Sequence, residues 1–248
     1  MATRQAKQAL RLWISQFWTR GIIPLIVLAG AGLMLHQPPP GSPADRALPP
    51  LDLRPGAPLV LTVFGTSLTA GAGWPGAVAG ALEACLARPV TLHRVARPGA
   101  TSVWALDQVA RVAATAPDVV IVEFAINDAD LRDGLTPDQG RATHHALIRA
   151  LQGTRPHARI VLMTMNPAQG LRALTRPRLA RHYADYADLA AETGVGLVDL
   201  YPRWLARPGG ARGLADGLHP EDAVATEVIL PVLLPYLGRL AGENCQAG

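Results

Sequence analysis

Cysteine is scarce in this chain of 248 residues, which has only Cys85 and Cys245. Two cysteines cannot make the dense disulfide framework of a small secreted domain. No CxxC motif or Cys/His cluster indicates a metal site, so we predict no metal and no cofactor. Apolar residues recur at helical spacing around Cys85, where a buried thiol is the simplest expectation. A bridge to Cys245 is permitted in an oxidising compartment, but the spacing does not require it.

Acidic residues are absent before Asp45, and Lys7 is the only lysine. The formal net charge of +4 comes from the basic residues at positions 4, 7, 11 and 20, because removing them from the 23 basic residues leaves 19, equal to the 19 acidic ones. A neutral folded part gives no support for a polyanionic partner. We therefore expect no nucleic-acid binding.

An uncharged apolar run, GIIPLIVLAGAGLML, occupies residues 21–35. The basic flank before it favours an N-terminus in the cytoplasm and the rest of the chain outside. We predict a basic cytoplasmic segment over residues 1–20 and a single-pass inner-membrane anchor over residues 21–35, although the run is short beside the ~17 to 25 residues of a typical span. The alternative is a signal peptide cleaved near Ala29-Gly30-Ala31, which would release a secreted protein.

Prolines are frequent over residues 36–58, where eight of them favour extended geometry and disfavour helix. We predict that this segment is a semi-rigid linker that holds a folded domain, residues 59–241, away from the bilayer. Residues 242–248 form a tail.

Short apolar runs alternate with longer helix-like segments in the predicted domain. Expected strands cover residues 59–64, 90–95, 118–124, 159–165 and 195–200, and expected helices cover residues 77–87, 103–114, 137–151, 178–193 and 224–240. This alternation predicts an α/β fold with a central parallel sheet covered by helices on both faces. In such sheets the site lies at the carboxyl ends of the strands. The polar residues 170–177, after the fourth strand, are a candidate rim of that site.

Candidate site residues follow the predicted strands one after another. Ser67 lies in a glycine-containing turn after the first strand, Gly99 follows the second, Asn127 follows the third, and Asp216 and His219 lie in the last loop. A serine hydroxyl can act as a nucleophile, and an Asp and a His three residues apart can meet on a turn to activate it. Gly99 and Asn127 can offer N–H groups to a developing oxyanion. Taken singly, Ser67, Gly99 and Asn127 are at least as well explained as parts of an ordinary turn or helix cap.

Together, the four segments between Gly65 and Pro220 resemble the blocks of the SGNH, or GDSL-type, hydrolase family. The resemblance implies that Ser67 is the nucleophile, His219 the base and Asp216 its orienting carboxylate. It also implies an oxyanion hole made by the Ser67 and Gly99 backbone N–H groups and the Asn127 side chain. The family fold is a three-layer α/β/α flavodoxin-like sandwich. The chain departs from the usual family pattern at Thr66, Arg94 and Ala125, where Asp, Asn and Gly are common.

The function expected from this resemblance is that of an envelope-tethered serine esterase that removes O-acyl groups, O-acetyl above all, from a polysaccharide. A lysophospholipase or thioesterase acting on lipid, a sugar O-acyltransferase, and an inactive glycan-binding module remain open alternatives. Trp74, Trp104, Tyr201 and Trp204 are candidates for a sugar platform, and each is equally well explained as core.

Overall fold

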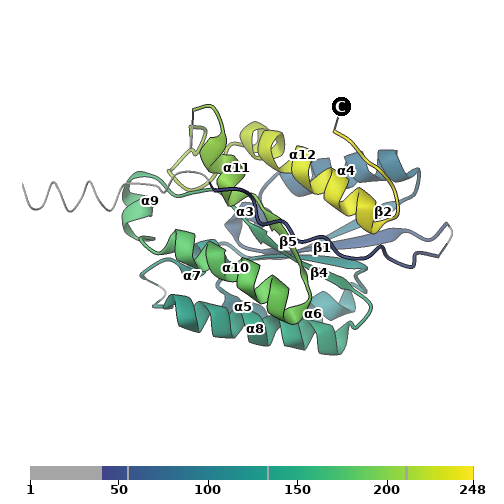
Figure 1. Cartoon of the computed structure of the whole chain (residues 1–248), viewed down its shortest axis with the longest axis horizontal. Coiled ribbons are helices and arrows are strands. Elements are labelled where there is room, and N and C mark those ends of the chain that lie inside the picture. The colour runs from purple at the N-terminus through teal and green to yellow at the C-terminus, as the bar shows by residue number, and fades with distance from the viewer. Residues whose placement is uncertain (1–40, 55, 133, 210–211, 248) are drawn as a thin grey trace, which may run out of the picture. The chain divides into compact units, whose positions relative to one another are not determined.

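The structure, a computed structural model, describes residues 41–54, 56–132, 134–209 and 212–247 (Figure 1). Its centre is a sheet of five strands, β1 (Leu59–Gly65), β2 (Val90–Ala96), β3 (Val119–Glu123), β4 (Arg159–Thr164) and β5 (Gly196–Asp199). All neighbouring strands are parallel, in the order β2-β1-β3-β4-β5. The predicted parallel sheet is confirmed, and the order is that of flavodoxin-like folds. The predicted anchor lies outside the described residues.

Helices cover both faces of the sheet (Figure 1). One face carries α4 (Trp74–Leu86) and α12 (Asp222–Leu240), and the other carries α5 (Ser102–Asp107), α6 (Val109–Ala114), α8 (Pro137–Thr154) and α10 (Leu179–Thr193). Four short helices, α3 (Ser67–Ala70), α7 (Ala125–Asp128), α9 (Gly170–Leu174) and α11 (Tyr201–Ala206), follow strands β1, β3, β4 and β5. The segments after the strands therefore meet at the carboxyl edge of the sheet.

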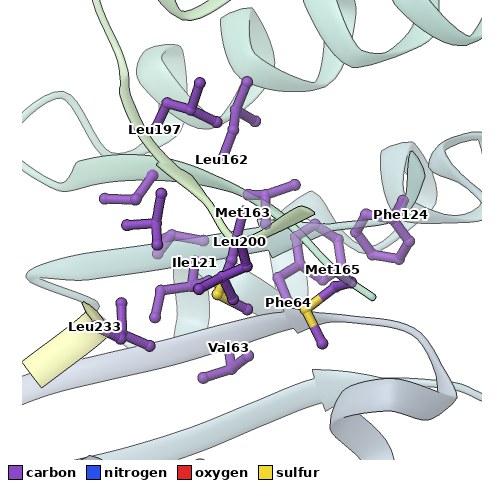
Figure 2. Close-up of a cluster of buried hydrophobic side chains, with 14 of the residues drawn as sticks. Val63, Phe64, Ile121, Phe124, Leu162, Met163, Met165, Leu197, Leu200 and Leu233 are labelled. Carbon is purple, nitrogen blue, oxygen red and sulfur yellow. The ribbon is translucent and has the colours of Figure 1, made fainter. Parts of the chain in front are cut away.

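The core lies between the sheet and the two helix layers. Strands β1, β3 and β4 are almost wholly buried, as their continuous apolar sequences require in a sheet covered on both faces. Figure 2 shows part of this core, where Val63 and Ile121, paired on adjacent strands, lie on the side of Leu233 of α12, and Leu162 and Leu197 lie on the other side of the sheet. A sheet packed on both faces holds its strand ends rigidly, which suits a site built there.

The observed elements differ from the predicted ones in a few places. The helix expected over residues 103–114 is two helices, because the backbone at Gln108 (φ −100°, ψ 0°) leaves helical geometry. The loop expected over residues 170–177 contains α9, and α11 was not predicted. The predicted start of a helix at Pro137 is confirmed, since α8 begins there. Thr136 and Gln139 form a capping box at this helix start.

Residues 44–53, which we call the strap, pack against the domain although they were predicted to be part of the linker. The Arg46 N–H donates to the Leu197 carbonyl of β5 (2.9 Å), and the Leu197 N–H donates back (3.1 Å). Three leucines at positions 48, 51 and 53 pack on the core. The strap thereby covers the edge strand β5, whose backbone would otherwise be open for pairing.

Cys85, near the end of α4, forms a disulfide with Cys245 in the tail, with 5.8 Å between the Cα atoms. This replaces the free thiol that was the simplest expectation at Cys85. The bridge joins the tail that follows α12 to the neighbouring helix of the same layer. Among the described residues, α12 is the one helix long and apolar enough to cross a membrane, and here it packs against α4 and β5.

Candidate active site

The turn after β1 presents Ser67 at the carboxyl edge of the sheet. Ser67 is the first residue of α3, and the Thr66 hydroxyl caps this short helix by accepting the Leu68 N–H (3.2 Å). The indole N–H of Trp74 donates to the Leu68 carbonyl (2.7 Å), which ties the far side of the turn to α4. The partly exposed Ser67 hydroxyl lies 2.8 Å from Nε2 of His219.

The loop before α12 brings Asp216 and His219 together. Oδ1 of Asp216 accepts the Nδ1–H group of His219 (3.0 Å) and two backbone N–H groups, from His219 (2.9 Å) and Leu218 (3.1 Å). With the proton on Nδ1, Nε2 is free to accept the Ser67 hydroxyl proton. The three residues are thus arranged as a serine hydrolase triad requires, from carboxylate to imidazole to hydroxyl.

Gly217 and Asn166 hold this loop in place. Gly217 has φ +80°, which favours glycine. A Cβ atom at this position would lie 2.7 Å from the Gln169 carbonyl oxygen, which is too close for two unbonded atoms. The Gly217 carbonyl accepts the Gln169 N–H (2.7 Å), and the buried Asn166 side chain donates to the Leu218 carbonyl (2.7 Å). Both Asn166 and Gln169 follow β4, so the end of that strand anchors the loop.

Arg172 of α9 is a further partner of the triad. Its guanidinium donates to Oδ2 of Asp216 (2.8 Å), the carboxylate oxygen opposite to the one that holds His219. Partial burial raises the pKa of Asp216, but hydrogen bonds from the His219 backbone, Arg172 and the His219 ring outweigh it and hold that pKa well below its ordinary value. The carboxylate therefore stays ionised throughout the neutral range and keeps the imidazole oriented.

Gly99 and Asn127 lie in the segments that follow β2 and β3, the strands on either side of β1. The Asn127 amide donates one N–H to the Ala100 carbonyl (2.9 Å), next to Gly99 (φ +72°). In the part of the chain that the structure describes, the backbone N–H groups of Ser67 and Gly99 donate to no acceptor. Backbone and side-chain N–H groups of this kind are the donors that oxyanion holes use.

A buried chain of polar groups supports the segments that carry Gly99 and Asn127. The Asp128 carboxylate accepts two hydrogen bonds from Ser102, one from its hydroxyl (2.5 Å) and one from its backbone N–H (2.8 Å). These bonds link α7 to the start of α5. The Tyr186 hydroxyl of α10 accepts the backbone N–H groups of Phe124 and Ala125 (3.1 and 3.2 Å) and pairs with Nε2 of the buried His144 (2.8 Å). His144 thus has a structural role.

A small pocket of about 190 Å³ opens beside Ser67 and His219. It is otherwise lined by Leu68, Gly71, Ala72, Pro220 and Asp222, from the end of α3 and the start of α12. Its walls thus come from the two segments that carry the serine and the histidine. A pocket of this size next to a serine hydroxyl has room for a small acyl group or a small alcohol.

Two residues that contact the site were not among the predicted site residues: Arg172 donates to Asp216, and Glu123 accepts the Thr66 N–H beside Ser67. Arg172 lies in the segment interpreted as a polar rim, and Glu123 ends an otherwise apolar strand, where a charged residue is itself a signal. Of the candidate sugar-platform residues, Trp74 and Trp204 are core, while Trp104 and Tyr201 are partly exposed. Among the described residues, no group of three His, Cys, Asp or Glu side chains is placed to hold a metal ion.

Comparison with known protein families identifies the family of the chain. The model of the GDSL-like lipase/acylhydrolase family matches residues 63–225, a range that includes every residue of the site. The chain belongs to this family. It is a carboxylic ester hydrolase of the SGNH/GDSL class, as the resemblance in sequence implied. A comparison with curated proteins finds no match.

Solved structures share the fold at low identity. A lipase/acylhydrolase from Enterococcus faecalis is 24% identical with a TM-score of 0.63, over 76% of this chain and all of that one. A putative GDSL-like lipase from Parabacteroides merdae is 18% identical (TM-score 0.64; 78% and 99% covered). A carbohydrate esterase family 3 protein from Talaromyces cellulolyticus is 16% identical (TM-score 0.63; 74% and 98% covered). At these identities the likeness concerns the fold.

Proposed function

We propose that this GDSL hydrolase is an envelope-tethered serine esterase that removes short O-acyl groups, acetyl above all, from a polysaccharide. The observation that carries the proposal is the unbroken set of contacts from Asp216 through His219 to the Ser67 hydroxyl. Ser67 attacks the ester carbonyl while His219 takes the hydroxyl proton and then delivers it to the leaving alcohol. Water, activated by the same imidazole, then hydrolyses the acyl-enzyme and frees the acid.

The oxyanion of each tetrahedral intermediate would be held by the N–H groups of Ser67 and Gly99 and the Asn127 amide. The contact between Asn127 and the Ala100 carbonyl orients that amide before substrate arrives. Donors that are already in place need no reorganisation when charge develops, which is the largest single source of catalysis in such sites.

Two features support a short acyl group on a sugar. The pocket beside Ser67, about 190 Å³, has small residues, Gly71 and Ala72, on its wall. Trp104 lies on α5, directly after the segment that carries Gly99, and is partly exposed, with the Arg97 guanidinium 4.8 Å from its ring centroid. A partly exposed indole near the segment that carries Gly99 is a suitable surface for a sugar ring.

The Cys85–Cys245 disulfide supports the proposed location outside the cytoplasm. Disulfides persist in the periplasm and in secreted proteins and are rare in reducing compartments. Together with the basic and apolar sequence of residues 1–35, it favours a domain exported across the inner membrane and held there by its N-terminal segment.

A second candidate, hydrolysis of lipid esters, is favoured by the exposed apolar residues. Leu171 and Leu174 on α9 are 81% and 44% exposed, and Leu131 after α7 is 55% exposed. Both segments follow strands at the carboxyl edge, where the site lies. Exposed leucines at the rim of an esterase site suit an acyl chain or a lipid surface.

The first experiment labels the purified full chain with a fluorophosphonate probe, which reacts with activated serines. We expect labelling in the parent and none in Ser67→Ala. Ser42→Ala, which removes the hydroxyl of an exposed serine outside the site, is the control and should be labelled like the parent. A folded parent that is not labelled would favour the inactive glycan-binding module.

The second experiment measures turnover of p-nitrophenyl esters from acetate to palmitate, beside acetate release from acetylated polysaccharide. The proposal expects the highest kcat/KM with the shortest chains and release of acetate from the polymer. A preference for long chains would replace it with the lipid alternative, and transfer of acetyl to an added sugar in place of hydrolysis would indicate an acyltransferase.

A further inference from the structure

Glu123, the last residue of β3, lies buried beneath the turn that carries Ser67. Its exposed fraction is 1%, and it is paired in register with Gly65 of β1. Oε1 accepts the Thr66 backbone N–H (2.6 Å) and the Thr69 hydroxyl (2.8 Å), and Oε2 accepts the Thr66 hydroxyl (3.0 Å). All of these donors lie within two residues of Ser67.

The carboxylate occupies space that the chain leaves open for it. A Cβ atom on Gly65 would lie 2.0 Å from Oε1 of Glu123 and 2.8 Å from the Thr69 hydroxyl oxygen. Any larger residue at position 65 would therefore displace the carboxylate from its donors. Glycine at position 65 therefore leaves room for the Glu123 carboxylate, and it also permits the tight turn.

No cation balances Glu123 among the ion pairs of the described residues. The titratable groups that act on it from α10 are Tyr183 and Tyr186, whose own pKa values are raised first by burial and further by Glu123. Burial raises the pKa of Glu123 to about 7, while hydrogen bonds from Thr66 and Thr69 lower it. An acid that is buried without a counter-ion is costly, and such groups cluster at functional sites.

We propose that Glu123 is a positioning residue for the nucleophile, whose carboxylate holds Thr66 and Thr69 and so fixes the turn that aims the Ser67 hydroxyl at His219. This inference rests on the proposed role of Ser67. It also gives a reason for the departure at position 66, where the family commonly has Asp: a threonine hydroxyl can donate to the carboxylate, whereas a second carboxylate would repel it. Thr66 and Thr69 thus supply the hydrogen-bond donors that the Glu123 carboxylate needs.

The test compares matched variants of the full chain. Thr66→Val and Glu123→Gln remove hydroxyl-to-carboxylate bonds with little change in volume, and Thr66→Ser keeps the hydroxyl. Thr62→Val is the control, since Thr62 is equally buried on β1 and its hydroxyl pairs with Thr115, away from the site. The readouts are kcat and KM on p-nitrophenyl acetate, the rate constant of fluorophosphonate labelling, and thermal unfolding.

We expect kcat and the labelling rate to fall about 10- to 100-fold in Thr66→Val and Glu123→Gln, the range for a slightly misplaced reacting group, with little change in KM. Thr66→Ser should keep most of the rate, and Thr62→Val should lower stability without slowing labelling. If Glu123→Gln does not fold, the two Thr66 variants decide the question.

Labelling of Thr66→Val at the parental rate would overturn the inference. Equal losses in Thr66→Ser and Thr66→Val would also overturn it, because keeping the hydroxyl would then not preserve the rate. A parent that is neither labelled nor active would instead refute the proposed function, and the inference with it.

Discussion

Nε2 of His219 lies 2.8 Å from Oγ of Ser67, although 152 residues separate them in the sequence. The two residues belong to loops at the same edge of the sheet, one after β1 and one before α12. Neither loop depends on the other for its local shape, since Thr66 and Glu123 hold the first, and Asp216, Asn166 and Gln169 hold the second. The sheet sets the distance between them, so its packing is part of the site.

The first prediction concerns Asn127. In Asn127→Ala the side-chain donor is lost while the Ser67 and Gly99 N–H groups remain, so kcat should fall by about 10²- to 10³-fold and remain measurable. The measurement is steady-state hydrolysis of p-nitrophenyl acetate, with circular dichroism to show that the fold persists. Full activity in this variant, together with loss of activity in Ser67→Ala, would show that Asn127 is no part of the oxyanion hole.

The second prediction concerns Gly217, with Gly242 as its matched control. Both have nearly the same φ, +80° and +82°, so alanine at either position should cost about 1 to 2 kcal/mol of stability. Only at position 217 does the added Cβ meet a neighbour, the Gln169 carbonyl oxygen at 2.7 Å. Gly217→Ala should therefore also displace His219 and lower kcat, whereas Gly242→Ala should not. Equal kcat values in the two folded variants would contradict this.

The sequence predicted the parallel sheet well because buried strands follow local patterns, and the structure brings three of the candidate residues, Ser67, Asp216 and His219, into contact. Buried parallel strands are short and apolar, and the site residues follow them directly, as Ser67 follows β1 and Asn127 lies four residues beyond β3. The break at Gln108 and the helix α9 were missed because short helices are decided by tertiary contacts more than by periodicity.

Pairings across long sequence distances could not be predicted in this way. Arg172 meets Asp216, Glu123 meets Thr66, and Cys85 meets Cys245 only because the fold brings their elements together. The strap was interpreted as linker from its prolines, although the leucines between them carry the signal for burial on the core. Each of these cases involves residues whose partners lie at least 40 positions away.

The third prediction concerns the size of the pocket beside Ser67. A Cβ atom on Gly71 meets no atom within 4 Å, so Gly71→Leu should extend into the pocket without disturbing the backbone. If this pocket takes the acyl group, the ratio of butyrate to acetate turnover should fall about tenfold or more. Gly80→Leu, at an exposed position of α4 that is equally open, is the control and should leave the ratio unchanged. An unchanged ratio in Gly71→Leu would place the acyl group elsewhere.

The fourth prediction concerns the disulfide. The bridge closes a loop of 160 residues, and its removal in Cys85→Ala/Cys245→Ala should lower the free energy of unfolding by about 2 to 5 kcal/mol. Cys85 lies eleven residues along α4 from Trp74, roughly 17 Å from the site side of that helix, so kcat of the folded protein should not change. Urea unfolding with and without reductant checks this, because reductant should destabilise the parent alone.

The fifth prediction is a dependence of stability on pH that comes from Glu123. Its pKa is raised from 4.5 to about 7 because burial disfavours the charged form, so between these values the folded protein holds a proton that the unfolded chain has released. Stability from this group is therefore fully present below pH 4.5 and is lost as pH rises to about 7. The loss amounts to roughly 3 kcal/mol.

Comparison with Glu123→Gln isolates this effect, because glutamine does not titrate. Burial lowers the pKa of His182 and raises that of Asp185, so both add their own dependence on pH, but they do so equally in the two proteins. The free energy of unfolding of the parent, minus that of Glu123→Gln, should fall by roughly 3 kcal/mol between pH 4.5 and 7.5 and then level off. Chemical denaturation at half-unit steps of pH measures this difference. A difference that stays constant across the range would mean that Glu123 is ionised throughout, held by the Thr66 and Thr69 donors more strongly than burial opposes them.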